Sequence, residues 1–144
     1  MDESGIEMEA LRKTPFFAEL SSEDLQDVLR VGEPASFEPG QAIVEQGDPA
    51  DGMYILTAGA AEVDVGGRFH RLKAGDLFGE MALISPSRRM ATVKAVESVA
   101  ALKIPAEEFR SFMLAHPNVA VSMLRAVVER LRKVEQRIDA WMAH

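Results

Sequence analysis

The sequence FGEMALISPSRRMATV, residues 78–93, is the most informative part of the chain. Gly79 lets the backbone approach a ligand closely, because glycine carries no side chain. The residues after it favour a helical turn, which would direct free backbone N–H groups at an anion. Arg89 can add a charge-assisted and bidentate contact to phosphate oxygens. Glu80 cannot bind phosphate but can accept a hydrogen bond from a sugar hydroxyl, and small Ala82 leaves the turn uncrowded. These residues fit the demands of a buried phosphate group.

A β-rich region surrounds this stretch, from residue 33 to residue 104. Its short runs are separated by turn signals at Gly40, Gly47-Asp48-Pro49, Gly59, Gly66-Gly67 and Gly75. Regular short strands with turns between them predict a β-roll or a sandwich. Residues 61–65 alternate between apolar and polar, and the glycine pair that follows suits a tight hairpin, whose two central residues need positive φ.

Helical patterns lie on both sides of the β-rich region. Apolar residues between Ile6 and Leu11 favour a short helix that ends at Thr14-Pro15, because the residue before proline avoids the helical region. A second helix is expected after the capping pattern Ser21-Ser22-Glu23-Asp24. Beyond the β-rich region, Pro105 is expected to occupy the first position of a helix, and Pro117 to open another.

The final helix, at about residues 118–142, carries apolar residues at spacings that alternate between three and four. They are Leu124, Val127, Leu131, Val134, Ile138 and Trp141. This seam spans about two and a half heptads, too few to promise a stable coiled coil. We expect a weak homodimer through residues 124–141; in the alternative, the stripe packs on its own roll and the protein is a monomer.

Composition favours one ordinary globular domain. The chain has 144 residues, of which 47% are hydrophobic and 27% charged. It has no apolar run near the roughly 20 residues that cross a bilayer, and no signal-peptide pattern, so we expect a cytoplasmic protein without membrane insertion. The absence of cysteine excludes disulfides, thiolate metal sites and thiol nucleophiles.

The charge is unevenly distributed along the chain. The net charge of −7 argues against nucleic acid as a partner. Residues 1–66 carry 3 basic and 15 acidic side chains, whereas residues 67–144 carry 13 basic and 8 acidic ones. An anionic ligand should therefore prefer the second half of the chain.

The pattern in residues 78–93 resembles the phosphate-binding cassette of the cyclic-nucleotide-binding family. Phe-Gly-Glu, Ala-Leu, an arginine nine residues after the glutamate and a following Ala-Thr all occur in register. The resemblance is closest to the cytoplasmic domain of bacterial cyclic-nucleotide-gated potassium channels, with catabolite-activator and protein kinase A regulatory-subunit domains more distant. It implies cAMP as ligand and no other cofactor. The site residues that it implies are Gly79, Glu80, Met81, Ala82, Arg89, Met90 and Ala91.

The resemblance also assigns roles and a fold. Gly79 and Glu80 would bind ribose, and the backbone N–H groups of Met81 and Ala82 would bind phosphate together with Arg89. The implied fold is mainly β with flanking helices: a double-stranded β-helix, or jelly-roll-like β-roll. Its parts would be an N-terminal helical segment (residues 1–32), the β-roll with its cassette (33–104 and 78–93), and C-terminal helices that form a lid (105–144).

One position departs from the family pattern. Relatives commonly have proline directly before the cassette arginine, whereas this chain has Arg88 there and its proline at Pro86. Arg88 could therefore assist with phosphate. In a degenerate member of the family, Glu80 and Arg89 would instead form only an internal ion pair.

Three residues of the final helix are further candidates. Arg130 aligns with a position that reaches the purine in channel-type domains, and Val134 lies one turn further on. Either could contact the base, or could be a solvated or seam residue. Trp141 could cap the ligand, although its heptad position favours packing.

The functional prediction is a non-catalytic regulatory module that binds cAMP in preference to cGMP and signals through its final helix. Relatives selective for cGMP place threonine directly after the cassette arginine, where this chain has Met90. Alternatively, the chain is the separated regulatory domain of a channel or larger regulator, and its downstream effector is unknown. A remote alternative is a cupin-like metal enzyme, but His70, His116 and His144 are scattered. Asp48 and Asp51 are interpreted as turn formers.

Overall fold

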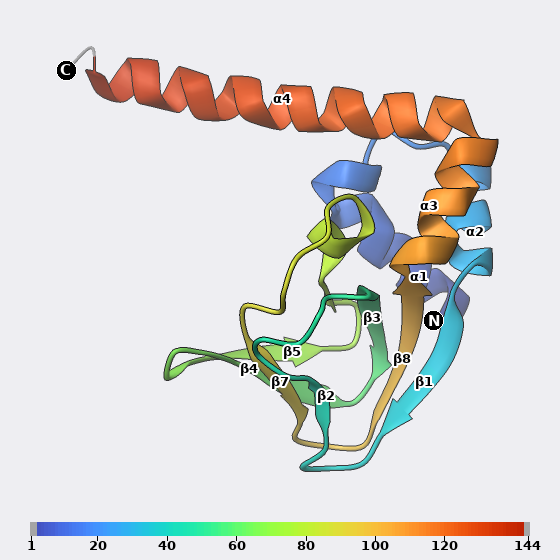
Figure 1. Ribbon diagram of the computed structural model, residues 1–144, viewed down its shortest axis with the longest axis vertical. Helices are drawn as coiled ribbons and strands as arrows, with labels where there is room; N and C mark the ends of the chain where they lie inside the picture. Colours follow the sequence, from blue (N-terminus) through green and yellow to red (C-terminus); the bar gives the residue numbers. More distant parts are fainter. Residues whose placement is uncertain (1–2, 143–144) are drawn as a thin grey trace.

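The roll is built from two antiparallel sheets in the computed structural model, which describes residues 3–142 (Figure 1). Their strand orders are β1-β8-β3-β6 and β2-β7-β4-β5. The strands are β1 (Glu33–Phe37), β2 (Ala42–Val44), β3 (Gly52–Ala58), β4 (Ala60–Val65), β5 (Arg68–Lys73), β6 (Leu77–Phe78), β7 (Thr92–Ala95) and β8 (Val99–Pro105). The predicted β-roll is confirmed.

The hairpin between β4 and β5 forms where the glycine pair predicted it. Gly66 and Gly67 have φ values of +58° and +88°, which side chains with a Cβ rarely adopt. The Asp64 carboxylate accepts a hydrogen bond of 2.8 Å from the Gly67 N–H. This turn sets the register in which all six residues of β4 pair with β5.

Strand β3 divides the hydrophobic core into two parts. Its side chains alternate between faces, so Met53 and Ile55 join the cluster beneath the helices. Tyr54 and Leu56 join the second cluster, inside the roll. Because both faces are covered, β3 is buried from Gly52 to Thr57. Its Tyr54 ring is therefore held in place inside the roll.

The helices pack at one end of the roll (Figure 1). They are α1 (Glu3–Lys13), the 3₁₀ turn η1 (Pro15–Phe17), α2 (Ser22–Arg30), α3 (Ala106–Ala115) and α4 (Pro117–Met142), with a second 3₁₀ turn, η2 (Glu80–Leu83), in the cassette. The Ser21 hydroxyl accepts a hydrogen bond from the Asp24 N–H at 3.1 Å, as the capping pattern predicts. Phe17 and Phe109 meet edge to face with ring centroids 6.0 Å apart, which locks η1 against α3.

Pro105 lies one position earlier than expected. It ends β8 and is the N-cap of α3, in extended conformation, rather than the first helical residue. The reason is the sheet: Pro105 pairs with Gly52 across β3 and β8, and the helix begins only after that pairing ends.

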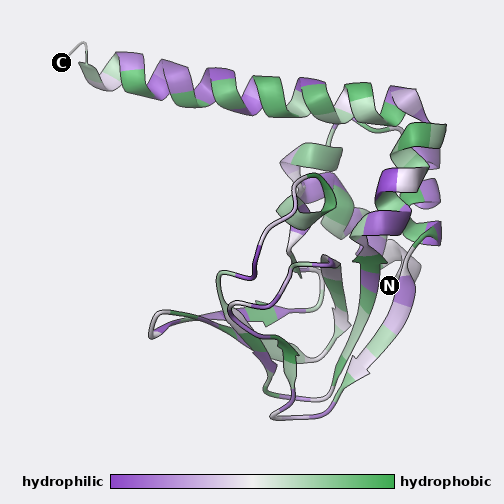
Figure 2. Cartoon of the chain, in the orientation of Figure 1, coloured by the Kyte–Doolittle hydropathy of each residue, from purple (hydrophilic) through white to green (hydrophobic). Residues whose placement is uncertain are grey.

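Helix α4 leaves the roll and extends away from it (Figure 1). Its first turns are anchored by the buried residues Val119, Met123 and Ala126, and every residue from 127 to 142 is exposed. Apolar and polar bands alternate along its length (Figure 2). Within residues 3–142 no single helix meets the length and hydropathy expected of a membrane span; α3 and α4 meet it only together, bent by 109°.

Candidate functional site

The cassette begins with a sharp change of direction after β6. Gly79 has φ +83°, in the left-handed region, and the 3₁₀ turn η2 starts immediately after it. Leu83 is fully buried and anchors η2 on the core beneath the helices. The Ala82 N–H donates to the Gly79 carbonyl at 3.1 Å. One of the two N–H groups that were predicted for phosphate is therefore already engaged within the turn.

Arg89 is a buried charged residue whose guanidinium group is held by hydrogen bonds. Its side chain is only 6% exposed, and Nη2 donates to the Gly52 carbonyl at 2.9 Å and to the Asp51 carboxylate at 3.2 Å. Its guanidinium carbon lies 5.8 Å from the centroid of the Tyr54 ring. Buried guanidinium groups are costly unless they are paired, so these contacts make the position tolerable.

The main chain of Arg89 is fixed by the loop that precedes β3. The Arg89 N–H donates to the Asp48 carbonyl at 2.8 Å, and the Arg89 carbonyl accepts from the Gly47 N–H at 2.9 Å. The Arg88 guanidinium donates to the Gly47 carbonyl at 2.8 Å. Arg88 therefore links the cassette loop to the loop before β3.

The position of the Arg89 side chain requires glycine at position 79. A Cβ at position 79 would lie 2.6 Å from Nη1 of Arg89 and 2.9 Å from the Gly52 carbonyl oxygen, closer than atoms pack. The sequence interpretation gave Gly79 a role in the approach of a ligand. The structure adds a second reason for glycine, since the guanidinium and the β3 backbone occupy the space that a side chain would need.

Asp51 carries two ion pairs, which corrects its interpretation as a turn former. Its carboxylate contacts Arg89 and also Lys103, whose Nζ lies at 2.8 Å. Burial alone would raise the pKa of Asp51, but the hydrogen bond and charge of Lys103, with the charge of Arg89, lower it below its ordinary value. Burial would likewise lower the pKa of Lys103, and Asp51 reverses this and raises it. Both groups are therefore charged at neutral pH.

A cavity of about 450 Å³ opens beside the cassette. All eight cassette residues proposed from sequence line it: Gly79, Glu80, Met81, Ala82, Arg88, Arg89, Met90 and Ala91. Val44, Ala50, Val63, Phe78, Ser85, Ser87 and Val93 complete the lining. The site is thus a mostly apolar pocket with one buried cation, the arrangement expected for a small organic anion.

The internal ion pair between Glu80 and Arg89 is not formed. Among the described residues, the ion-pair partner of Arg89 is Asp51. The Glu80 side chain lines the cavity and has no hydrogen bond or ion pair with any of residues 3–142. Its carboxylate is therefore available as an acceptor for a ligand.

Arg130 and Val134 do not line this cavity, and both are exposed on α4. Trp141 is 80% exposed near the end of the same helix. Their contact with a ligand stays a prediction, because it requires α4 in a different position.

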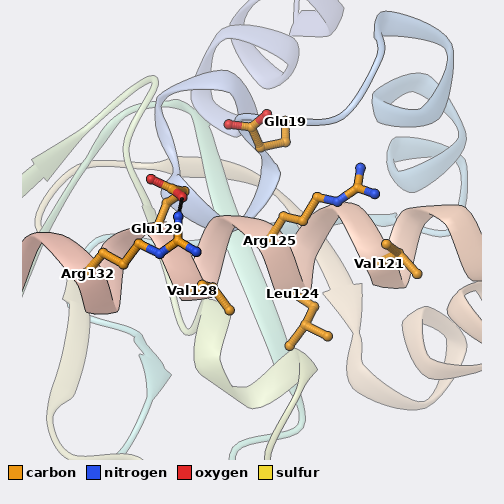
Figure 3. Close-up of a pocket in the computed structure, with 7 residues that line it drawn as sticks. All are labelled: Glu19, Val121, Leu124, Arg125, Val128, Glu129 and Arg132. Atoms are coloured by element: carbon orange, nitrogen blue, oxygen red, sulfur yellow. Dashed lines mark hydrogen bonds and ion pairs between the residues drawn. The ribbon is translucent and has the colours of Figure 1, made fainter.

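A second hollow, of about 600 Å³, lies along α4 (Figure 3). It is lined by Val121, Leu124, Arg125, Val128, Glu129 and Arg132 of α4 and by Glu19 of the segment opposite. Arg132 is paired with Glu129 at 2.9 Å, and all seven lining residues are exposed. This hollow has no buried charge, so it lacks the feature that makes the cassette cavity suited to an anion.

A metal centre has no support in the described part of the chain. Residues 3–142 contain no group of three or more possible ligands gathered in one place. His70 lies on β5 and His116 between α3 and α4, while His144 lies outside the described residues.

The groups that contact the Arg89 guanidinium within the protein could not be found from the sequence. They are the Gly52 carbonyl, the Tyr54 ring, and Asp51, which also pairs with Lys103. Lys103 is separated from Asp51 by 52 positions, and only the pairing of Tyr54 with Lys103 across β3 and β8 brings them together. No local motif carries that signal.

Comparisons with known proteins agree with the geometry of the site. The model of the cyclic nucleotide-binding domain matches residues 34–116. A cyclic nucleotide-gated potassium channel of Rhizobium etli is 33% identical over 116 residues, which are 81% of this chain and 33% of the channel. The chain spans about a third or less of the length of the curated relatives that it matches.

Solved structures show the same architecture. The N-terminal domain of a transcriptional regulator from Streptomyces coelicolor A3(2) has a TM-score of 0.77 at 30% identity, over 88% of this chain and 95% of the other. The catabolite activator protein of Thermus thermophilus has a TM-score of 0.64 at 27% identity, over 90% and 63%. The matched family model and the shared roll lead to one conclusion: this chain belongs to the cyclic nucleotide-binding domain family.

Proposed function

We propose that this chain is a non-catalytic receptor module that binds cAMP in preference to cGMP and reports occupancy through α4. The observation that carries the proposal is Arg89, a cation fixed at the wall of the cassette cavity with part of its donor set unused. Nη2 is engaged by Asp51 and Gly52, and no bond from Nε or Nη1 to any described residue competes with a ligand. A cyclic phosphate would accept from these donors.

The remainder of the cavity suits the rest of the nucleotide. Glu80 provides a carboxylate for a ribose hydroxyl, and Val63, Phe78 and Val93 supply apolar walls. Met90 is 84% exposed beside the cavity and has no hydroxyl to offer a guanine. We expect a preference for adenine for this reason.

The lid function rests on the apolar stripe of α4. In this structure the stripe is exposed, with Leu131 56% and Ile138 51% accessible. A bound nucleotide would present its base at the cavity mouth, and burial of that base against Val134 and Arg130 would favour a closed position of α4. A ligand shifts the helix only by its higher affinity for the closed form.

The same stripe supports the proposed weak homodimer through residues 124–141. Closure over the base and pairing with a second copy need the same face, so we expect them to compete. The similarity to a channel and to a transcriptional regulator supports a role as the sensing part of a larger regulator. The effector itself is unknown.

Calorimetry with cAMP, cGMP and cyclic dinucleotides tests the proposal. We expect saturable binding of cAMP with a single site per chain and weaker binding of cGMP. Equal affinities for cAMP and cGMP would overturn the base preference. Absence of binding to every cyclic nucleotide would overturn the receptor function.

A further inference from the structure

The Asp51 carboxylate is divided between two cations. Oδ2 contacts Nζ of Lys103 at 2.8 Å, whereas Oδ1 contacts Nη2 of Arg89 at 3.2 Å. The shorter contact is the one to Lys103. Asp51 therefore engages Arg89 with a single oxygen at the longer distance, rather than in a bidentate arrangement.

The fold fixes this division. Asp51 directly precedes β3, and its backbone carbonyl accepts a hydrogen bond of 2.9 Å from the Ala106 N–H at the start of α3. Lys103 lies on β8, next to β3, and its side chain is 21% exposed with Nζ 5.8 Å from the centroid of the Tyr54 ring. The carboxylate is thus held between β8 and the cassette by elements that do not belong to the cassette.

This arrangement bears on how well an anion can bind. A carboxylate beside Arg89 neutralises the charge that attracts a phosphate, and a bidentate pair would also occupy the donors that a phosphate needs. Lys103 counteracts both effects, because its ammonium group holds one oxygen of the Asp51 carboxylate at 2.8 Å and pairs with that negative charge. Lys103 does not line the cavity, so it cannot act by touching the ligand.

We propose that Lys103 is a positioning residue for the anion site: from β8 it holds one oxygen of the Asp51 carboxylate and so leaves Nε and Nη1 of Arg89 for a phosphate. This rests on the proposed function, since it concerns how the same site binds a cyclic nucleotide. The lowered pKa of Asp51 and the raised pKa of Lys103 agree with a strong contact between the two.

The first test replaces the charge of Lys103 and keeps its aliphatic stem. Lys103→Met should weaken cAMP binding about fivefold, the order of a partly exposed ion pair, and Lys103→Arg should restore it. Because the action is on the phosphate, cGMP should weaken by the same factor and the ratio of the two affinities should stay constant. The matched control is Lys94→Met, an exposed lysine on β7 outside the cavity lining, which should bind as the parent does.

The second test asks whether Lys103 acts through Asp51. In an Asp51→Asn background the carboxylate can no longer close on Arg89, so adding Lys103→Met should have little further effect on cAMP affinity. A fivefold loss that persists in this background would mean a direct long-range effect of charge and would overturn the proposal.

The outcomes separate this inference from the proposed function. Failure of the parent chain to bind any cyclic nucleotide overturns the receptor function and the inference with it. Binding by the parent with unchanged affinity in a folded Lys103→Met variant overturns the inference alone, and so does a loss that Lys103→Arg does not restore. Thermal unfolding of each variant identifies any loss that comes from misfolding.

Discussion

The cassette carries ligand binding in the proposed function and α4 carries signalling, and the two regions differ in burial and in contacts with the rest of the fold. In the cassette, Arg89 is 6% exposed and tied by side-chain and main-chain hydrogen bonds to the loop before β3. In α4, every residue from 127 to 142 is exposed, including an apolar stripe that ends at Trp141. The cassette is thus held by contacts within the protein, whereas the outer half of α4 carries apolar side chains that remain to be buried.

The difference follows from where each region finds its partners. The cassette lies between strands and is fixed by contacts with β3 that any folded copy of the chain must make. The outer half of α4 has no such contacts, and exposed apolar side chains lower the free energy when they are covered. The affinity for a phosphate should therefore depend on the cassette and on the Asp51–Lys103 pair beside Arg89, whereas the position of α4 should depend on ligand and on concentration.

The largest expected effect is on the rigid half. Arg89→Ala should weaken cAMP binding by about 3 kcal/mol, roughly a hundredfold, because a buried phosphate would lose its charged donor. Calorimetry measures the change. The control is Arg88→Ala, whose guanidinium is engaged with the Gly47 carbonyl, and it should cost much less. The reverse ranking would show that the register of the cassette is wrong.

The second prediction tests whether the close approach of Arg89 to Gly79 is needed for the fold and the site. Gly79→Ala should destabilise the fold by about 1–3 kcal/mol and also weaken cAMP binding, because the new Cβ would be strained and would press on the guanidinium. Gly40→Ala is a matched control, since Gly40 has φ +87° but no atom within 4 Å of a built Cβ.

Denaturant unfolding and calorimetry are compared for the two variants. Strain at positive φ is common to both, so the difference between them is the cost of crowding Arg89 and the Gly52 carbonyl. Equal losses of stability, with unchanged cAMP binding in Gly79→Ala, would show that the close approach at Gly79 has no role in the site.

The contrast between the two regions also explains what could be predicted from sequence. The cassette is contiguous, so its resemblance to the family pattern singled out Gly79, Glu80 and Arg89, which the structure brings to one cavity. Local turn and capping signals predicted the Gly66-Gly67 hairpin and α2. The support of Arg89 could not be assigned, because Asp51 and Lys103 meet only through the register of β3 with β8. The helix could be predicted from its periodicity, but periodicity does not say what an apolar face packs against.

Glu80→Ala should have a smaller effect than Arg89→Ala. The loss of one acceptor for a ribose hydroxyl should weaken cAMP binding by about 1 kcal/mol, or fivefold, and leave stability unchanged because the carboxylate has no partner among the described residues. Glu97→Ala, at an exposed position between β7 and β8, is the control. A loss of stability without a loss of affinity would assign Glu80 to the fold instead.

The stability of the fold should depend modestly on pH through the Asp51 carboxyl group, which pairs with Arg89 and Lys103. The folded-state pKa of Asp51 lies below its ordinary value, so its ion pairs contribute stability above about pH 4 that is lost as the pH falls through the folded-state pKa. Unfolding experiments on the parent and on Asp51→Asn should therefore differ at neutral pH and converge in acid. The difference is small because the Asp51 side chain is 63% exposed.

The smallest expected effect is on the exposed half. Sedimentation should find mainly monomer at low concentration and a growing dimer fraction at high micromolar concentration, because a seam of about two and a half heptads gives only marginal pairing. Saturating cAMP should reduce that fraction, since a helix closed over the base cannot offer the same face to a second chain. Leu131→Ser, in the seam, should abolish the dimer, while Lys133→Ser, outside it, should not. A protein that is monomeric with and without cAMP would remove the dimer and leave closure over the nucleotide as the only role for the stripe.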